Sequence, residues 1–425
     1  MNQLALNIKK YKKNFPPPLE AWKKKRKIRR RIFLGVTLLA VAVGLMFIPT
    51  TMILRASPSG NDISDQLGQN VDNTLGNIDF GDLDNMVLGL GDGSFNLFGG
   101  DNFAQRVGRI LSGEFQEDHP TMLSALFALF GSVILDMLPI LMLIVGIAIL
   151  SGFMQALKTD TGGEGVKNVV HFVTYAAIVV IVMIGVVEIV ALVGGALNLM
   201  KRQMDIIFPI LLTLMVAVGG NTSASVYQPA VALLSNGVMQ IFSFVVMPIF
   251  IITLVFSVVG HLSPSARLDK FVSFFTSAYK WLIGIVFTIF LSFLTIQGIT
   301  AGIHDGVSIR AARFTISSYV PILGGYISQG FDLVVASSIL IKNAIGVAGL
   351  YLLFGIVLGP ILKIVVFSLT LKLAAAITQP IADERISNFL STVNKSFSML
   401  ASVLIGAAFM YFFTIGLIII TGNVI

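Results

Sequence analysis

Ionisable side chains inside long apolar stretches are the residues of this sequence most suited to chemistry. A charge at the centre of a bilayer is costly unless it is paired or hydrated, so such residues commonly mark ion pathways, proton relays or subunit contacts. Alternatively, they pair with one another, face a partner subunit or, for Lys, extend to the membrane surface. Five side chains meet this description: Asp136, Glu188, Asp332, Lys342 and Lys363.

A short apolar run that ends in a polar, glycine-rich break is the second candidate feature. Residues 206–218 are apolar over only 13 positions, whereas a helix needs about 20 residues to cross the hydrocarbon core. The break exposes peptide groups that lipid cannot satisfy, so protein must cover it or it must line a wet cavity. Residues 324–330 form a similar polar stretch. The candidate pore-lining or packing residues are Gly219, Gly220, Asn221, Thr222, Ser223, Gly324 and Gly325.

Two interpretations of these glycine-rich stretches stay open. Paired broken segments indicate a substrate site or pore in transporters that are built from repeats. The alternative is tight helix packing through small residues. An ion pair between Asp332 and Lys342, across a bend of the second segment, is a further possibility.

The patterns of common catalytic and metal sites are missing from the sequence. It has no phosphate-binding loop and no His-Glu-x-x-His pair, and its four histidines lack metal-ligand spacing. Asp79, Asp82, Asp84 and Asp92 could bind calcium loosely, but a solvated acidic linker is the better interpretation. The sequence therefore predicts no catalytic residue, no cofactor and no metal, and an intramembrane enzyme is disfavoured.

Composition identifies a polytopic membrane protein. The chain of 425 residues is 55% hydrophobic and only 12% charged, which excludes a soluble globular protein. Its first 31 residues hold twelve Lys/Arg against one acid. Such a cluster before an apolar span stays cytoplasmic and attracts anionic lipid headgroups, so nucleic acid is not an expected partner. Cysteine is absent.

The chain divides into four predicted regions. A basic cytoplasmic tail (1–31) precedes a signal anchor or transmembrane helix (32–54), although cleavage after Ala56 stays open. Residues 55–120 form an acidic, flexible extracytoplasmic segment that contains short apolar pieces, such as 67–78 and 103–111, and one or two amphipathic helices. Residues 121–425 form a helical membrane domain, interrupted by polar loops at 158–167, 200–204, 219–228, 261–280, 304–318 and 379–395.

A weak internal repeat of about 112 residues organises the membrane domain. Phe208-Pro-Ile-Leu211 recurs as Val320-Pro-Ile-Leu323, and Met247-Pro-Ile-Phe250 recurs as Gly359-Pro-Ile-Leu362. Chance recurrence in so apolar a chain is the alternative. On the repeat interpretation, the broken segments 205–229 and 317–341 occupy corresponding places.

Loop charges favour one topology for these two segments. If both re-enter the membrane from outside, eight basic loop residues are cytoplasmic and four external, whereas if both cross, the numbers are seven and five. The positive-inside rule favours re-entry. The predicted fold is therefore an all-α polytopic membrane protein with seven transmembrane helices, two re-entrant segments, an internal N-terminus and an external C-terminus.

Several motifs of residues 120–420 together resemble the stage III sporulation protein AE family. They are the Leu-Leu-Thr-Leu run followed by Gly-Gly-Asn-Thr-Ser-Ala-Ser within 210–229, Thr295-Ile-Gln-Gly298, His304-Asp-Gly-Val-Ser-Ile-Arg310, Tyr319-Val-Pro-Ile-Leu-Gly-Gly325 and Lys342-Asn-Ala-Ile-Gly-Val-Ala-Gly349. The long basic N-terminus departs from the shorter, signal-like starts that are typical of the family.

The resemblance implies a non-enzymatic membrane subunit of the channel or secretion-like complex between mother cell and forespore. The protein would lie in the mother-cell membrane around the forespore. Its implied partners are the other stage III sporulation A-operon proteins, including an ATPase, and the forespore stage II sporulation protein Q. An autonomous secondary transporter or channel for a small solute is the alternative.

Overall fold

The computed structural model describes residues 61–90, 101–113, 119–157, 164–262, 268–319, 324–380 and 384–421. Every regular element in these residues is a helix, so the predicted all-α class is confirmed. A helix satisfies its own backbone hydrogen bonds, which is why apolar sequence adopts this form in lipid. Apart from the first four residues of one helix, these elements belong to the compact unit Asp65–Ile425. The predicted basic tail and first span (1–54) lie outside the described residues.

Among the described residues, six helical stretches are long and apolar enough to cross a membrane, as expected for a multi-pass membrane protein. They are Leu126–Phe153, Phe172–Ala217, Asn221–Gly260, Asp269–Ile296, Gln329–Thr378 and Arg385–Ile420. The predicted total of seven is not confirmed, because it counts residues 32–54.

Five long helices form most of the membrane domain: α7 (His119–Leu157), α8 (Glu164–Ala217), α12 (Asp269–Tyr319), α13 (Gly324–Thr378) and α14 (Glu384–Ile420). Helices α8, α12 and α13 contain 54, 51 and 55 residues. At 1.5 Å per residue each is about 80 Å long, against about 30 Å for the hydrocarbon core. Each can therefore continue well beyond a membrane that it crosses.

The segment between α8 and α12 is one helical path with two widened stretches. It consists of α9 (Asn221–Ala232), a π-helical stretch η4 (Leu233–Val238), α10 (Met239–Ile241), a second π-helical stretch η5 (Phe242–Val246) and α11 (Met247–Leu262). Pro248 has no N–H, so it cannot bond the carbonyl of Phe244, and the wider turns just before it accommodate that loss. Widened turns of this kind often occur at functional sites.

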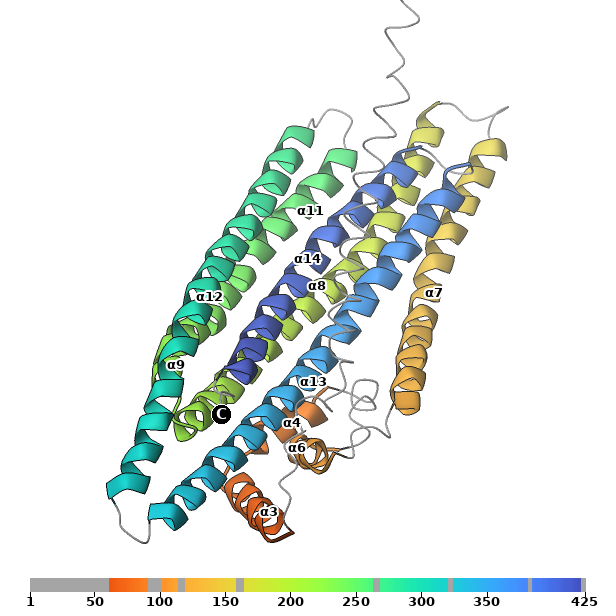
Figure 1. Ribbon diagram of the computed structural model, residues 1–425. Coiled ribbons are helices and arrows are strands. Elements are labelled where there is room, and N and C mark those ends of the chain that lie inside the picture. Colours follow the sequence, from red (N-terminus) through yellow and green to blue (C-terminus); the bar gives the residue numbers. More distant parts are fainter. Residues whose placement is uncertain are drawn as a thin grey trace, which may run out of the picture. The chain divides into compact units, whose positions relative to one another are not determined.

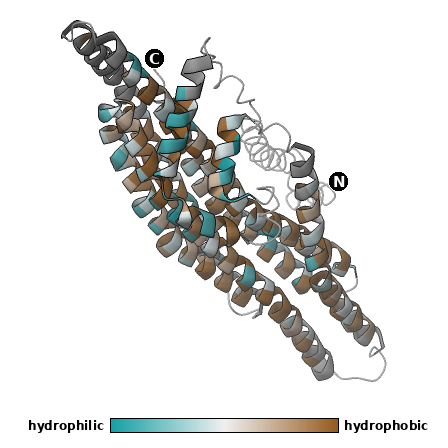
Figure 2. Ribbon diagram, turned by 90° about the horizontal axis from the view of Figure 1, so that it is seen from below, coloured by the Kyte–Doolittle hydropathy of each residue, from teal (hydrophilic) through white to brown (hydrophobic). Residues whose placement is uncertain are grey.

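The helix ends gather at two opposite ends of the bundle. Figure 1 shows the ends joining α7 to α8, α11 to α12 and α13 to α14 at its top, and those joining α8 to α9 and α12 to α13 at its bottom. Hydrophobic residues cover most of the bundle in Figure 2, and hydrophilic residues occur in short stretches. The two predicted broken segments thus lie toward the same end.

Two predicted loops are wrong. Helix α8 continues without interruption through 200–204, and α12 continues through 304–318. The first polar stretch is one face of a helix: Arg202 is exposed, whereas Gln203 and Met204 are buried. Because no loop turns the chain back at 200–204, the re-entrant topology is not confirmed.

The internal repeat is not confirmed either. An offset of 112 residues carries Gly219, at the end of α8, to Phe331. Phe331 lies within α13, past the reversal between Tyr319 and Gly324. The two reversals therefore do not correspond at that offset.

Three helices precede the membrane domain: α3 (Asn61–Gly76), α4 (Gly81–Leu88) and α6 (Phe103–Ser112). Helices α3 and α6 overlap the short apolar pieces 67–78 and 103–111 of the sequence. Helix α6 packs on α13, and the Arg106 guanidinium of α6 lies 5.8 Å from the Tyr351 ring centroid of α13. Phe103 and Val107 of α6 are buried. The flexibility of the wider 55–120 segment stays a prediction.

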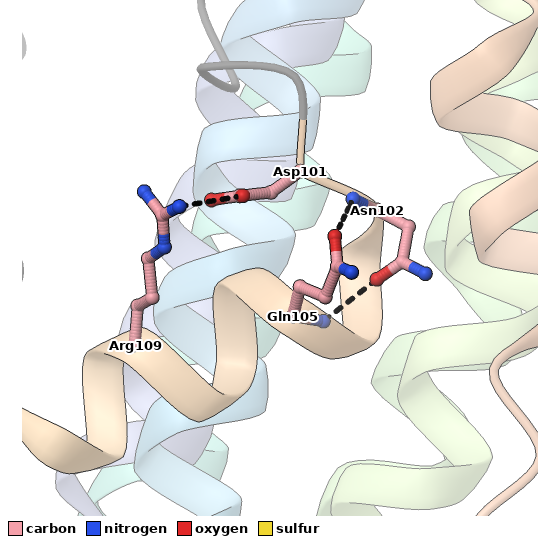
Figure 3. A network of polar contacts seen from close by, with 4 residues as sticks. All are labelled: Asp101, Asn102, Gln105 and Arg109. Carbon is pink, nitrogen blue, oxygen red and sulfur yellow. Dashed lines mark hydrogen bonds and ion pairs between the residues drawn. The ribbon is translucent and has the colours of Figure 1, made fainter.

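A polar network fixes the start of α6 (Figure 3). The Asn102 side chain accepts from the Gln105 N–H at 2.8 Å, and the Gln105 side chain accepts from the Asn102 N–H at 3.0 Å. Arg109 pairs with Asp101 at 3.0 Å. Asp84, considered above for calcium, instead accepts from the Phe103 N–H at 2.7 Å. The described residues contain no group of three potential metal ligands.

Candidate functional site

The chain reverses direction between α8 and α9 at a glycine pair. The Gly220 N–H donates to the Met215 carbonyl at 2.9 Å, and the Gly219 N–H donates to the Val216 carbonyl at 2.8 Å. Gly219 has a φ of 89°, the left-handed conformation that this helix ending requires. The predicted break at 219–221 is therefore confirmed as a tight turn between two helices.

Replacing Gly219 with Ala should lower the free energy of unfolding by about 1–2 kcal/mol, because a Cβ is strained in the left-handed region. The matched control is Gly195→Ala in the same α8 helix, where an added Cβ meets open space. There the higher helix propensity of Ala should slightly increase stability. Unfolding by SDS in mixed micelles, followed by circular dichroism, measures both. Equal stability of the two variants would contradict the assigned role of Gly219.

The tip of this hairpin is anchored to the rest of the domain. Val218 packs against Val335 and Ile339 of α13. The Tyr227 hydroxyl lies 3.0 Å from Thr421 Oγ1, at the end of α14. The hairpin is thus held against α13 and α14 at its closed end.

A groove of about 480 Å³ lies between the end of α8 and the α9–η4 segment. Its size is within the usual range of ligand pockets. It is lined by Met204, Asp205, Pro209, Leu212, Thr213, Val216, Ala224, Ser225, Gln228, Val231, Ala232, Ser235 and Asn236.

A second cavity of about 520 Å³ follows along the same two antiparallel segments. We call the two cavities together the hairpin groove. The second cavity is lined by Val190, Gly194, Leu197, Asn198, Lys201, Met239, Gln240, Ser243, Phe244 and Met247.

The polar lining of the hairpin groove is mostly uncharged. Lys201 Nζ and Asp205 Oδ2 lie 2.7 Å apart, so the ionic groups in its lining neutralise each other. The remaining polar groups are amides and hydroxyls, such as Gln228, Asn236 and Thr213, which both donate and accept hydrogen bonds. The groove can therefore bind uncharged polar groups, and its lining contains no nucleophile with a neighbouring base.

Along the helices that form the hairpin groove, the exposed side chains change from apolar to mainly polar. On α8, Val180, Ile184 and Val187 are 58–66% exposed, whereas from Asn198 onward the exposed positions carry mainly polar side chains, with Val216 as the large apolar exception. The segment that includes α9 changes in the same way between Gln240 and Phe244. One end of both helices therefore suits lipid and the other suits water.

The predicted site residues lie beside the groove rather than in it. Gly219 to Ser223 form the turn and the first residues of α9, and Gly220 and Ser223 are buried. Gly324 and Gly325 begin α13, and neither lines the groove. Prediction missed the groove residues. Their polar members in 225–240 follow one another at spacings of 3, 7, 1 and 4 positions, which fit one face of a helix and were a helical signal; they are Ser225, Gln228, Ser235, Asn236 and Gln240.

The predicted intramembrane ionisable residues do not form one pathway. Glu188 Oε1 pairs with Lys363 Nζ at 3.1 Å, which links α8 to α13. Lys342 is fully buried and donates from Nζ to the Thr421 carbonyl at 2.5 Å. Asp136 is exposed on α7.

The suggested pairing of Asp332 with Lys342 across a bend is wrong. Both residues lie in the uninterrupted helix α13, and the reversal before it ends at Gly324. Ten helical residues separate their Cα atoms by about 15 Å along the axis. Asp332 is half-buried.

Elsewhere in the domain, glycines allow two helices to pack closely, which is the alternative role considered above for the glycine-rich stretches. A Cβ added at Gly185 would lie 2.6 Å from the Phe367 ring, and one at Gly349 would lie 2.8 Å from Ile207 Cδ1. At the second contact, Gln203 Nε2 also donates to the Gly349 carbonyl at 2.6 Å. Small residues therefore let α8 approach α13 closely.

Comparison with known proteins agrees with the motifs noted in the sequence. A family model described as stage III sporulation protein AE matches residues 102–422. The Bacillus subtilis (strain 168) protein called Stage III sporulation protein AE is 25% identical over 301 residues, which cover 71% of this chain and 75% of that protein. No solved structure matches the chain.

Proposed function

Because the chain belongs to the stage III sporulation protein AE family, we propose that it is a non-enzymatic membrane subunit of the channel complex between mother cell and forespore, and that spore development requires it. Its place would be the mother-cell membrane around the forespore. Its partners would be the other stage III sporulation A-operon proteins, including an ATPase, and the forespore stage II sporulation protein Q.

The main support for this proposal is that the exposed side chains of α8 and of the α9 segment change from apolar to mainly polar along the hairpin groove. A subunit that only crosses a membrane needs lipid-facing residues along its whole length, whereas α8 ends in a segment with mainly polar exposed residues. We infer that α8 and the α9 segment leave the membrane near Asn198 and Gln240. The hairpin then extends toward the forespore side, where it can contact other subunits or line a conduit.

Chemical labelling tests which side the hairpin occupies. We expect Thr213→Cys and Ser225→Cys to react with a membrane-impermeant maleimide added outside intact, non-sporulating cells that express the chain in their cell membrane, because both native residues are exposed beyond the inferred boundary. The chain has no cysteine of its own, so each label reports a single site. Lys372→Cys, at the other end of α13, should react only after permeabilisation, and the lipid-facing Ile184→Cys should react poorly. If the reagent labelled Lys372→Cys from outside and did not label Ser225→Cys, the chain would have the opposite orientation in the membrane.

Gene deletion tests the function itself. We expect cells without the gene to reach engulfment and then fail to produce heat-resistant spores, with restoration by the wild-type gene expressed in the mother cell. Expression restricted to the forespore should not restore them. Normal spore counts after deletion would refute the proposal.

An autonomous transporter for a small polar solute is the second candidate, and the hairpin groove is what favours it. Purified protein in liposomes separates the two functions. Solute flux without partner proteins would support the transporter, and flux only with partners present would support the channel subunit.

A further inference from the structure

Helix α7 presents an acidic residue on a mostly apolar outer face, on which Ser132 is the other exposed polar residue of the candidate span. Its inner face packs against α8 and α13 with buried residues such as Met137 and Ile144. On the outer face Leu135 is 66% exposed and Met142 is 69% exposed. Asp136 is exposed between them, within the candidate span Leu126–Phe153.

The depth of Asp136 makes its exposure costly. It lies ten residues into the 28-residue span, which corresponds to about 15 Å along the helix axis. A long Lys or Arg side chain could reach the membrane surface from there, but the short Asp side chain cannot. A carboxylate at this depth is costly unless it has a partner or is hydrated.

The described part of the chain supplies no such partner. No hydrogen bond or ion pair joins the Asp136 carboxylate to another described residue. Lys363, a base within another span, already pairs with Glu188. The predicted first span, residues 32–54, contains no Lys, Arg or His and so offers no cation.

We propose that the outer face of α7 around Asp136 docks a transmembrane helix of another protein, which carries a Lys or Arg at middle depth in the membrane. Charge complementarity identifies this occupant. A second copy of this chain that docked through the same face would place Asp136 against apolar side chains or against another acid, and neither neutralises it. The proposal concerns a surface apart from the hairpin groove and does not depend on the channel function.

Synthetic helices test the docking surface without an identified partner. The full chain, labelled with a fluorescent donor at Ser124→Cys, is reconstituted in phosphatidylcholine liposomes at neutral pH. The probes are acceptor-labelled oligoleucine peptides long enough to span the bilayer, with Lys, Leu or Glu at the central position. We expect energy transfer to show about tenfold tighter association of the Lys peptide than of the Leu peptide, the scale of polar contacts between membrane helices.

Two variants make the test specific. Asp136→Asn keeps the shape of the side chain and should abolish the preference for the Lys peptide, while Glu188→Gln removes the acid already paired with Lys363 and should preserve it. Equal binding of all three peptides would overturn the proposal, as would a preference that survives Asp136→Asn.

A second copy of the chain is the other occupant that the experiment can detect. If donor- and acceptor-labelled protein associates with itself, Asp136→Asn abolishes that association and the Lys peptide is not preferred, the surface binds a second copy and the proposal is overturned. The readout is independent of spore formation, so it can fail while the proposed function stands.

Discussion

Replacing Lys342 with Glu should lower the free energy of unfolding by about 3–5 kcal/mol, the cost expected for leaving a buried charge without its compensating partner. The native side chain is fully buried, and its Nζ donates to the Thr421 carbonyl at 2.5 Å. Thr421 directly follows α14, where the last carbonyls carry a partial negative charge that a cation stabilises. A carboxylate at the same place would be repelled by that charge and would find no donor in the Thr421 carbonyl.

Two further variants separate charge from packing at this position. Lys342→Met keeps most of the side-chain length and removes the charge, so it should cost about 1–3 kcal/mol, the range for a buried acceptor that loses its donor. Lys372→Glu makes the same charge change at an exposed position of the same helix and should cost little. Denaturation by SDS followed by circular dichroism measures all three variants. If Lys342→Glu were as stable as Lys372→Glu, the contact of Lys342 with the Thr421 carbonyl would not stabilise the end of α14.

The Lys342 contact also shows why the sequence predicts local features, such as a turn, but not contacts between residues that are far apart in the chain. The turn at Gly219 was predictable because its signal is local: two glycines follow an apolar run, and a left-handed residue at a helix end favours glycine. The partner of Lys342 lies 79 residues away, and a single sequence contains no signal that joins α13 to the end of α14. The Glu188–Lys363 pair was unpredictable for the same reason.

The re-entrant interpretation of 205–229, which the structure does not confirm, rests on an assumption about length. Residues 206–218 are too few to cross a membrane, and re-entry followed from treating them as a separate segment. In the structure they continue α8, and buried Phe208 and Leu211 alternate with exposed Thr213. A helix that continues outside a membrane, as proposed above for α8, needs only one apolar face. Lys201 and Asp205, one turn apart, mark that continuation and form the ion pair of the hairpin groove.

Replacing Gly349 with Leu should destabilise the chain by about 3 kcal/mol, at the upper end of the cost of overfilling a packed interior. A Cβ alone would lie 2.8 Å from Ile207 Cδ1, and Ile415 Cδ1 is 3.6 Å away. Ile207 is fully buried and cannot move into solvent. The larger side chain must therefore separate α8 from α13, which also lengthens the hydrogen bond from Gln203 to the Gly349 carbonyl.

A double-mutant cycle assigns this effect to the contact itself. Ile207→Ala removes the atoms that an added side chain would strike, so Gly349→Leu should cost at least about 1 kcal/mol less in that background, a coupling typical of residues in direct contact. Gly330→Leu is the matched control, because Gly330 is exposed on α13 and an added Cβ there meets open space. Thermal unfolding in detergent and SDS titration should rank the variants in the same order. Additive costs of Gly349→Leu and Ile207→Ala would mean that α8 and α13 do not meet at this glycine.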